Sequence, residues 1–399
     1  MRRVQNIVDK ELCIGCGLCE AVFGSDVAQM EEGRSGFFTP VFRHKERVEE
    51  DVILRICPGV NIVNDQPFDR GENIWGKLLE AYSGYSKQKD IRYSASSGGV
   101  ISGVAVYMLE NKLVDAVLQV GGDSKDYKRN SLRVSRSRAD VLACSSSRYA
   151  PSLVFDKVLK ILNDSTDRFL FIGKPCDVSG IKNLIKEFPE YENRFVLFVA
   201  LFCAGIPSFS ATQEVIETFP EVKYPIRDLM YRGEGWPGKF SFVDHAGSYF
   251  SMSYNESWGD KLGKKLHFRC KICPDGIGLQ ADVAVGDAWE TVDGYPDFSD
   301  KEGQSLVLLR TLKATKLFMQ MQLEKQLKLS LLSLQNVRQM QPFQYSRRRV
   351  AGVRMLATIV GKRVFLNFRG LRLGTSIMRL PFFKGVREFF GTLKRIMLK

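Results

Sequence analysis

Four cysteines near the N-terminus have the spacing of iron-sulfur ligands. Three follow one another at two-residue intervals, Cys13-Ile-Gly-Cys16-Gly-Leu-Cys19, and the fourth, Cys57, precedes Pro58. Such a loop offers three thiolates to one cube, and small glycines let backbone N–H groups approach the sulfurs. The pattern predicts one 4Fe-4S cluster. The alternative is a zinc knuckle, which favours two separated CxxC pairs.

Four further cysteines lie in the middle of the chain and are predicted to form a second ligand set. Cys176 and Cys203 each follow an apolar run typical of a β-strand, so both would leave the same edge of one sheet. Cys270 and Cys273 add a CxxC pair. A second 4Fe-4S cluster is the hypothesis, and the alternative is that single cysteines after strands are packing residues. The ninth cysteine, Cys144, is predicted to be structural.

A turn rich in serine and glycine, Ser96-Ser97-Gly98-Gly99, runs into an apolar helix predicted over Val100–Glu110. Its N–H groups would face outward at the positive end of the helix dipole, where phosphate binds. A strand-like run over 113–120 follows, as in nucleotide-binding layers. Many helices begin with Ser and Gly only for capping, and the turn is neither a Walker loop nor a GxGxxG motif.

Charge is distributed unevenly along the 399 residues. The net charge is +13, and the segment from Val337 to Lys399 holds 15 Lys or Arg and one acid, Glu388. Leu, Ile, Met and Phe stand between these cations at roughly helical spacing, which favours contact with an anionic membrane surface. A helical pair that packs on the body is the alternative. Nucleic acid is not expected, because no recognition motif accompanies the charge.

The longest apolar run, residues 195–207, is too short to span a bilayer, and the first residues contain no apolar stretch of signal-peptide length. We therefore expect a cytoplasmic protein that does not cross the membrane, with the basic tail peripheral at its inner face. An odd number of cysteines, nine, favours metal ligands over a disulfide framework.

Several motifs stand in one order between about Cys13 and about Leu309: SASSGGVISGVAVYML, SSSRYAPSL, FIGKPCDVSGIKNL, LFCAGIPS, YRGEGWPGKF, SYNESWG and FRCKICPDGIGLQADVAVGDAW. In these the chain resembles the coenzyme F-420 (deazaflavin) hydrogenase/dehydrogenase beta-subunit family. That family is a group of iron-sulfur flavoproteins that includes 7-hydroxymethyl chlorophyll a reductase. The tail after Asn336 lies outside the shared region and is similar to that of relatives found beside polysaccharide-assembly enzymes.

The resemblance implies a bound FAD and supports two 4Fe-4S clusters. The residues that match the flavin-phosphate turn are Ser96, Ser97, Gly98 and Gly99. Neighbouring motifs place Arg148, Tyr149 and Lys174 in the same pocket, with structural support of the sheet edge as their alternative role. The family implies Cys176, Cys203, Cys270 and Cys273 as ligands beside the flavin. The N-terminal cluster is then the outer electron port.

A loop from Tyr231 to Gly238 is expected on the substrate side. Arg232 would bind an anionic group, Trp236 would stack, and Glu234 would be a proton partner. A plain hairpin turn is the alternative. His267, beside the CxxC pair, is predicted either to donate a proton or to be a satisfied structural residue.

We expect an α+β fold in four parts. These are a ferredoxin-like 4Fe-4S unit over 1–65, a flavin-phosphate region over 75–160, a mixed α/β catalytic region with the second cluster over 161–335, and a basic helical tail over 336–399.

The expected function is that of an iron-sulfur flavoprotein oxidoreductase. Electrons would pass between ferredoxin-type carriers, two 4Fe-4S clusters and FAD, to or from an organic small-molecule substrate. The substrate would be a deazaflavin coenzyme or a polysaccharide-pathway metabolite. The alternative is a non-catalytic electron-transfer subunit that relays electrons to a partner enzyme.

Overall fold

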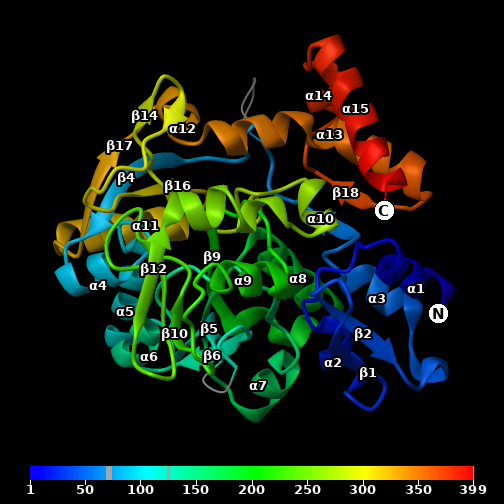
Figure 1. Cartoon of the computed structure of the whole chain (residues 1–399), viewed down its shortest axis with the longest axis horizontal. Helices are drawn as coiled ribbons and strands as arrows, with labels where there is room; N and C mark the ends of the chain where they lie inside the picture. Colours follow the sequence, from blue (N-terminus) through cyan, green and yellow to red (C-terminus); the bar gives the residue numbers. More distant parts are fainter. Residues whose placement is uncertain (69–73, 124–125, 399) are drawn as a thin grey trace.

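A mixed nine-stranded sheet forms the centre of the chain (Figure 1). The computed structural model describes residues 1–68, 74–123 and 126–398. The strands lie in the order β17-β4-β16-β13-β9-β8-β5-β6-β7. In chain order they are β4 Glu80–Ser86, β5 Ala116–Gly122, β6 Asn130–Ser135, β7 Ser152–Leu153, β8 Phe169–Gly173, β9 Phe195–Leu201, β13 Val283–Asp287, β16 Ser305–Leu309 and β17 Leu327–Leu331.

Four neighbouring strands, β5, β8, β9 and β13, run parallel in the middle of this sheet. β8 reads Phe-Leu-Phe-Ile-Gly and is buried along its whole length. Such continuous apolar runs form strands that are covered on both faces, as parallel strands are. All four strands therefore end at one edge of the sheet.

Helices cover both faces of the sheet. One face packs on α5 (Val100–Glu110) and α11 (Leu312–Leu323), with Val104 and Phe318 in its core. The other face packs on α7 (Val158–Asp164) and α8 (Pro175–Glu187), with Phe171 and Ile181 in its core. The short helices α4 (Lys89–Ser94) and α6 (Arg138–Ala143) lie beside α5.

The N-terminal residues form a small unit against this body. It comprises α1 Arg2–Asp9, α2 Leu18–Phe23, the antiparallel hairpin β1 Ala28–Glu32 and β2 Phe38–Phe42, η1 Lys45–Arg47, α3 Glu50–Ile56 and β3 Asn61–Val63. Phe155 N donates to Cys16 O at 2.8 Å, which ties the cysteine loop to the body. The ferredoxin-like class expected for this unit stays a prediction.

A three-stranded antiparallel sheet carries the expected substrate-side loop. Its strands are β10 Arg227–Met230, β11 Lys239–Val243 and β12 Tyr249–Ser253. α9 Phe209–Ile216 packs on it, and η3 Asn255–Gly259 and η4 Leu262–Lys264 follow its last strand. η2 Pro189–Arg194 lies beside α8 and β9 of the central body instead. The remaining elements of this region are α10 Phe268–Lys271 and the hairpin β14 Thr291–Val292 and β15 Tyr295–Pro296.

The C-terminal segment is less detached than its composition suggests. It forms α12 Leu334–Met340, α13 Pro342–Lys362, β18 Asn367–Arg369, α14 Leu373–Met378 and α15 Phe382–Met397. Arg348, Val350 and Ala357 of α13 are buried, and β18 pairs in parallel with β3 of the N-terminal unit. Charge alone does not reveal this packing, because the buried residues of α13 include the polar Gln344 and the charged Arg348. Parts of residues 337–369 therefore pack on the body, and the expected division at 336 stays a prediction.

The fold is thus mixed α/β around one large mixed sheet. Among the described helices, none combines the length and the apolar character needed to cross a bilayer.

One glycine fixes the loop that follows the CxxC pair onto the sheet. Gly278 has a φ of 67°, and a Cβ at this position would overlap the Cβ of Ala200 in β9. We predict that Gly278→Ala lowers the free energy of unfolding by about 3 kcal/mol, through strain and overpacking. The matched control is Gly391→Ala in α15, where a Cβ meets nothing within 4 Å. Urea denaturation measures both, and equal stability of the two variants would contradict the packing argument.

Candidate functional site

The four N-terminal cysteines surround one small cavity. Cys13, Cys16 and Cys19 come from the loop that leads into and through the start of α2, and Cys57 follows the last turn of α3. All four line the cavity. Gly15, with a left-handed φ of 68°, donates its N–H to Cys13 Sγ at 3.5 Å. The structure thus brings the predicted ligands together.

Burial makes these thiols hard to ionise. It raises the pKa of Cys13 to about 12, with the nearby Cys57 adding to the effect. Burial also raises the pKa of Cys16, Cys19 and Cys57. Four thiolates in this cavity would repel one another, and a positively charged metal group would offset that repulsion.

The four central cysteines meet at the edge where the parallel strands end. Cys176 lies in the first turn of α8 directly after β8, Cys203 follows β9, and Cys270 and Cys273 belong to α10 and the turn after it. Burial is the main cause that raises the pKa of Cys176, Cys203 and Cys270, and the other thiols of the set add to it. Residues far apart in sequence are thus neighbours.

Neither set is shaped for a single ion. Within residues 1–68, 74–123 and 126–398, no three His, Cys, Asp or Glu side chains are close enough to hold one metal ion. Cysteines that bind different irons of one cluster stand further apart than the ligands of one ion. The two clusters, and the zinc alternative for the N-terminal set, therefore stay predictions.

Arg269 joins the two cysteine sets. It is 2 % exposed, directly precedes Cys270, and donates to Gly59 O at 2.6 Å and to Pro58 O at 3.2 Å. These carbonyls immediately follow Cys57. One buried guanidinium thus fixes the fourth N-terminal cysteine to the CxxC helix.

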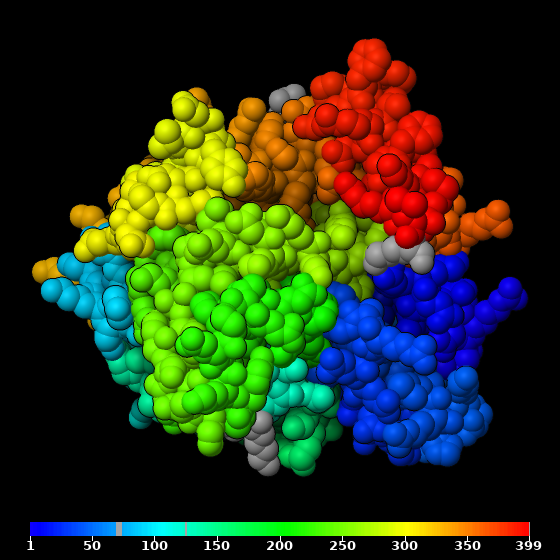
Figure 2. Space-filling view, viewed as in Figure 1, coloured from blue at the N-terminus to red at the C-terminus, as the bar shows by residue number. Residues whose placement is uncertain are grey.

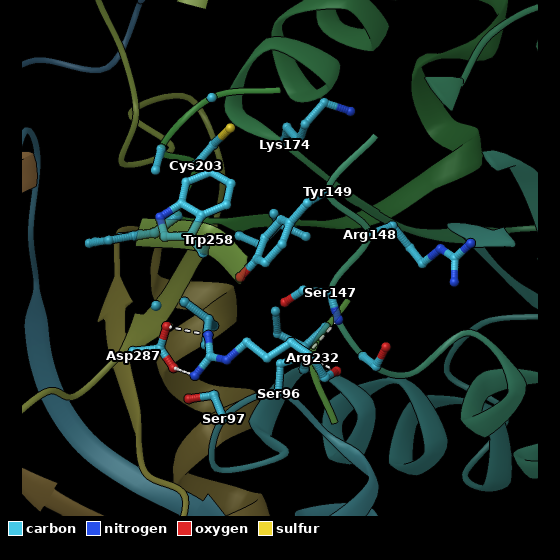
Figure 3. A pocket seen from close by; sticks show the side chains of 18 of the residues that line it. Ser96, Ser97, Ser147, Arg148, Tyr149, Lys174, Cys203, Arg232, Trp258 and Asp287 are labelled. Carbon is cyan, nitrogen blue, oxygen red and sulfur yellow. Dashed lines mark hydrogen bonds and ion pairs between the residues drawn. The ribbon is translucent and has the colours of Figure 1, made fainter. Parts of the chain in front are cut away.

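A cavity of about 550 Å³ opens beside the central cysteines (Figure 3). Its wall includes Lys174 after β8, Cys203 after β9 and Asp287 at the end of β13. Cavities of this size hold cofactors and small ligands. Because Cys203 lines it, the cavity and the second cysteine set share a wall.

The predicted phosphate turn forms one end of this cavity. Ser96, Ser97, Gly99 and the first three residues of α5 line it. Within the described part of the chain, the N–H groups of residues 100–102 make no hydrogen bond. The Ser96 hydroxyl accepts from Ser147 N at 2.6 Å, and the Ser97 hydroxyl donates to Gln304 O at 2.9 Å. The backbone at the start of α5, rather than these hydroxyls, is therefore free for an anion.

Gly98 packs against the central sheet and does not face the cavity, where a phosphate-binding residue is expected. It does not line the cavity, and a Cβ there would lie 2.5 Å from Gly84 O in β4 and 2.7 Å from Ser305 N in β16. The glycine lets the turn pack closely on two strands, so it acts on the cavity only through the position of the turn.

Arg148, Tyr149 and Lys174 all line the cavity but differ in what they contact. Arg148 donates to Asn130 Oδ1 at 2.6 Å and to Leu229 O at 2.7 Å, and its guanidinium points away from Tyr149 (Figure 3). This geometry matches the sheet-support alternative. Tyr149 packs on Trp258 with ring centres 4.6 Å apart, and Lys174 Nζ pairs with Asp177 at 2.7 Å.

Of the three residues expected on the substrate side, only Arg232 lines the cavity. Its guanidinium forms a two-pronged ion pair with Asp287 at 2.9 and 2.7 Å (Figure 3). Burial by itself lowers the pKa of Arg232, but Asp287 and Tyr149 outweigh it and raise that pKa. The anion that Arg232 binds is thus a residue of the protein.

Trp236 and Glu234 do not fit the roles expected of them. Trp236 is 3 % exposed, stacks on Trp289 at 4.7 Å, and donates its indole N–H to Asp287 at 2.9 Å. Glu234 lies on the outside, where it accepts from Tyr249 Oη at 3.1 Å. His267 caps α10 by accepting from Arg269 N at 3.1 Å, which matches its structural alternative.

Two family models match the chain. The N-terminal model of the coenzyme F420 hydrogenase/dehydrogenase beta subunit covers residues 81–160, and the C-terminal model covers 166–334. The chain belongs to this family. Neither the N-terminal cysteine unit nor the segment from α13 onward lies within the matched residues.

Relatives include the coenzyme F420 hydrogenase subunit beta of Methanococcus voltae, 25 % identical over 55 % of this chain and 77 % of its own length. The coenzyme F420-dependent sulfite reductase of Methanocaldococcus jannaschii is 24 % identical over 78 % of this chain, which spans 46 % of that protein. A chain from the F420-reducing [NiFe] hydrogenase complex of Methanosarcina barkeri has the same fold, with a TM-score of 0.55 at 18 % identity, covering 75 % of this chain and 99 % of that one.

The structure adds site residues that sequence reasoning did not select. Asp287 ends β13, Trp258 faces Tyr149, and Arg347 of α13 donates to Cys203 O at 3.0 Å and to Cys270 O at 3.1 Å. The first two stand in family motifs, so the GDAW and NESWG strings could have signalled them. Arg347 lies outside the family models, and no pattern marked it.

We predict that Arg269→Met lowers the free energy of unfolding by about 3 kcal/mol and reduces the iron bound per chain. The change leaves the buried carbonyls of Pro58 and Gly59 without a donor and loosens the loop at Cys57. The control is Arg34→Met, an exposed arginine. Urea denaturation and iron analysis measure both effects, and full iron content in the Arg269 variant would speak against the link.

Proposed function

We propose that this protein is an iron-sulfur flavoprotein oxidoreductase that exchanges electrons between a protein carrier and an organic substrate. One observation carries the proposal: Cys203 belongs to the central cysteine set and also lines the cofactor-sized cavity, while Arg269 links the central set to the N-terminal one. The names of the relatives, which are hydrogenase, formate dehydrogenase and sulfite reductase proteins, support this reaction class.

The residues present fit two 4Fe-4S clusters. Cys13, Cys16, Cys19 and Cys57 would hold the first, and Cys176, Cys203, Cys270 and Cys273 the second. Each set offers four thiols outside any disulfide, and desolvation raises the pKa of seven of the eight. Bound clusters supply one-electron transfer, and FAD supplies hydride as well as one-electron chemistry.

The cavity fits FAD in two respects. The unpaired N–H groups at the start of α5 suit a diphosphate, at the positive end of that helix. Tyr149, Tyr254 and Trp258 supply aromatic wall for a planar ring. We therefore assign Ser96, Ser97 and Gly99 to the phosphate end through their backbone, and Gly98 to the support of that turn.

The chain's own charges shape the rest of the cavity. Lys174 is held by Asp177 and puts a positive charge at the wall between the cavity and Cys176. Arg232 and Asp287 neutralise each other, and the guanidinium lies 4.8 Å from the ring centre of Tyr254 and 5.2 Å from that of Trp289. Arg232 is thus a positioning residue that fixes two aromatic walls.

The first substrate that we propose is a deazaflavin coenzyme, because several relatives are named for coenzyme F420. An aromatic cluster of Trp289, Tyr295, Phe298 and Phe343 lines the cavity and suits a planar ring. No comparison favours a polysaccharide-pathway metabolite. The electron carrier on the other side would be a ferredoxin or a partner enzyme.

The second candidate is an electron-transfer subunit without a substrate of its own. It is favoured by relatives that are named as beta subunits of hydrogenase and formate dehydrogenase. Reduction of deazaflavin by the isolated chain with dithionite supports the enzyme. Reduction only after a partner enzyme is added supports the subunit.

Metal and flavin content test the cofactor assignment. Anaerobically purified protein should contain about eight irons and one FAD per chain, the number that two four-iron clusters imply. Cys16→Ala and Cys203→Ala should each remove about four irons. Cys144→Ala is the control, because Cys144 belongs to neither set, and it should retain all the iron. Four irons in the unmodified protein, or loss of iron in the Cys144 variant, would overturn the assignment.

A charge at the start of α5 tests the flavin site separately. Ser102 lines the cavity in the first turn of the helix. Ser102→Asp should reduce FAD affinity at least tenfold, about 1.4 kcal/mol, by repelling the diphosphate, whereas Ser102→Asn should change it little. Flavin fluorescence titration measures the affinity, and iron content should be unchanged in both. Equal FAD affinity in the two variants would place the diphosphate elsewhere.

A further inference from the structure

The last two helices present an apolar face that nothing in the described chain covers. The exposed side chains there are Met378 (87 % exposed), Phe382 (76 %), Phe383 (85 %), Phe390 (62 %) and Met397 (75 %). Figure 2 shows these helices, in red, standing out from the body. Soluble surfaces carry single exposed apolar residues without consequence, but a contiguous group marks an interaction site.

The apolar side chains of this face are arranged along one side of α15. Phe383, Val386, Phe390 and Met397 recur at helical spacing and form one stripe. The opposite side of the helix, with Phe389 and Thr392, packs on α13. The helix is therefore held in place by its inner side while its outer side remains uncovered.

Cations border the stripe. Arg387 and Lys394 follow Phe383 by four and eleven residues, and Lys384 and Arg395 lie further round the helix. Within residues 1–68, 74–123 and 126–398, none of these four side chains forms an ion pair. The single acid of the segment, Glu388, faces inward and pairs with Arg354 at 2.8 Å. The exposed side of α15 thus combines aromatic side chains with charges that are all positive.

We infer that α15, with the turn at Met378–Phe383, is an interfacial helix that binds the surface of an anionic lipid bilayer. Exposed Phe and Met would enter the boundary between headgroups and acyl chains, while Arg387 and Lys394 contact lipid phosphates. α15 has 16 residues and lies along α13, so it would rest on the bilayer rather than cross it. The inference does not depend on the redox proposal.

The structure restricts membrane contact to a shorter segment than the charge distribution predicts. α13 carries many of the cations after residue 336, but Arg347 and Arg348 donate to carbonyls near the central cysteines, at Cys203 and Pro274. Those arginines are committed to the body. The lipid-binding face is therefore confined to residues 378–398.

Sedimentation of the full chain with vesicles tests the inference. The protein should bind vesicles that contain phosphatidylglycerol and phosphatidylcholine, and bind phosphatidylcholine alone far more weakly. Phe383→Ser with Phe390→Ser should weaken vesicle binding roughly 30-fold, because two aromatic rings that would be buried in the lipid are lost. Arg387→Gln with Lys394→Gln should weaken it roughly tenfold or more.

The matched control is Leu323→Ser with Leu331→Ser, two leucines that are 83 % and 72 % exposed on other elements. It should bind as the unmodified chain does. All variants should keep the same iron content and visible spectrum, because every changed side chain lies at the surface.

Three outcomes would overturn the inference. The first is absence of binding to the anionic vesicles, or equal binding to both vesicle types. The second is loss of vesicle binding with the charge variant only, which indicates electrostatic attraction without insertion of the aromatic side chains. The third is a smaller oligomer for the Phe variant in the absence of lipid, which indicates that a second copy covers this face.

Discussion

The parallel pairing of β8, β9 and β13 is the constraint on which the site depends. In this register Gly173 lies opposite Ala200, and Leu201 lies opposite Val285, so the three strands end together. Lys174 and Cys176, then Cys203, then Asp287 leave the sheet at that edge. Side chains that stand more than a hundred residues apart are thereby delivered to one cavity.

Buried and half-buried arginines hold the segments that meet at this edge. Arg269 ties the loop after Cys57 to α10, Arg232 ties the loop after β10 to the end of β13, and Arg347 ties α13 to the carbonyls of Cys203 and Cys270. A planar guanidinium donates in several directions at once, so one arginine can bind two acceptors of another segment. The same three contacts bring the N-terminal unit, the small sheet and the C-terminal helix to the central cysteines.

The C-terminal segment therefore has two roles, one for α13 and one for α15, which cannot be distinguished from its amino-acid composition. α13 uses Gln341, Gln344 and Arg347 to close the cavity beside the cysteines, with Gln341 donating to Asp287 O at 2.6 Å and Gln344 to Cys203 O at 3.1 Å. α15 faces outward with its aromatic and basic stripe. A lipid-bound α15 would hold the cavity near a membrane surface without any contribution to its chemistry.

The sequence by itself determined the two cysteine sets, the buried strands and the start of α5. Cysteine spacing, continuous apolar runs and a Ser-Gly turn are local, and local patterns act through backbone geometry and burial. Tertiary structure alone decided the partners of the charged groups. The loop around Arg232 suggests that this arginine binds an anionic substrate, yet Asp287 neutralises it. The motif around Gly98 suggests a phosphate-binding loop, yet Gly98 packs on Gly84. The basic segment around Arg347 suggests an exposed tail, yet Arg347 donates to the carbonyl of Cys203. The physical reason is that the role of a charge or a glycine depends on the groups within a few ångströms of it, and the folding of the whole chain decides which groups those are.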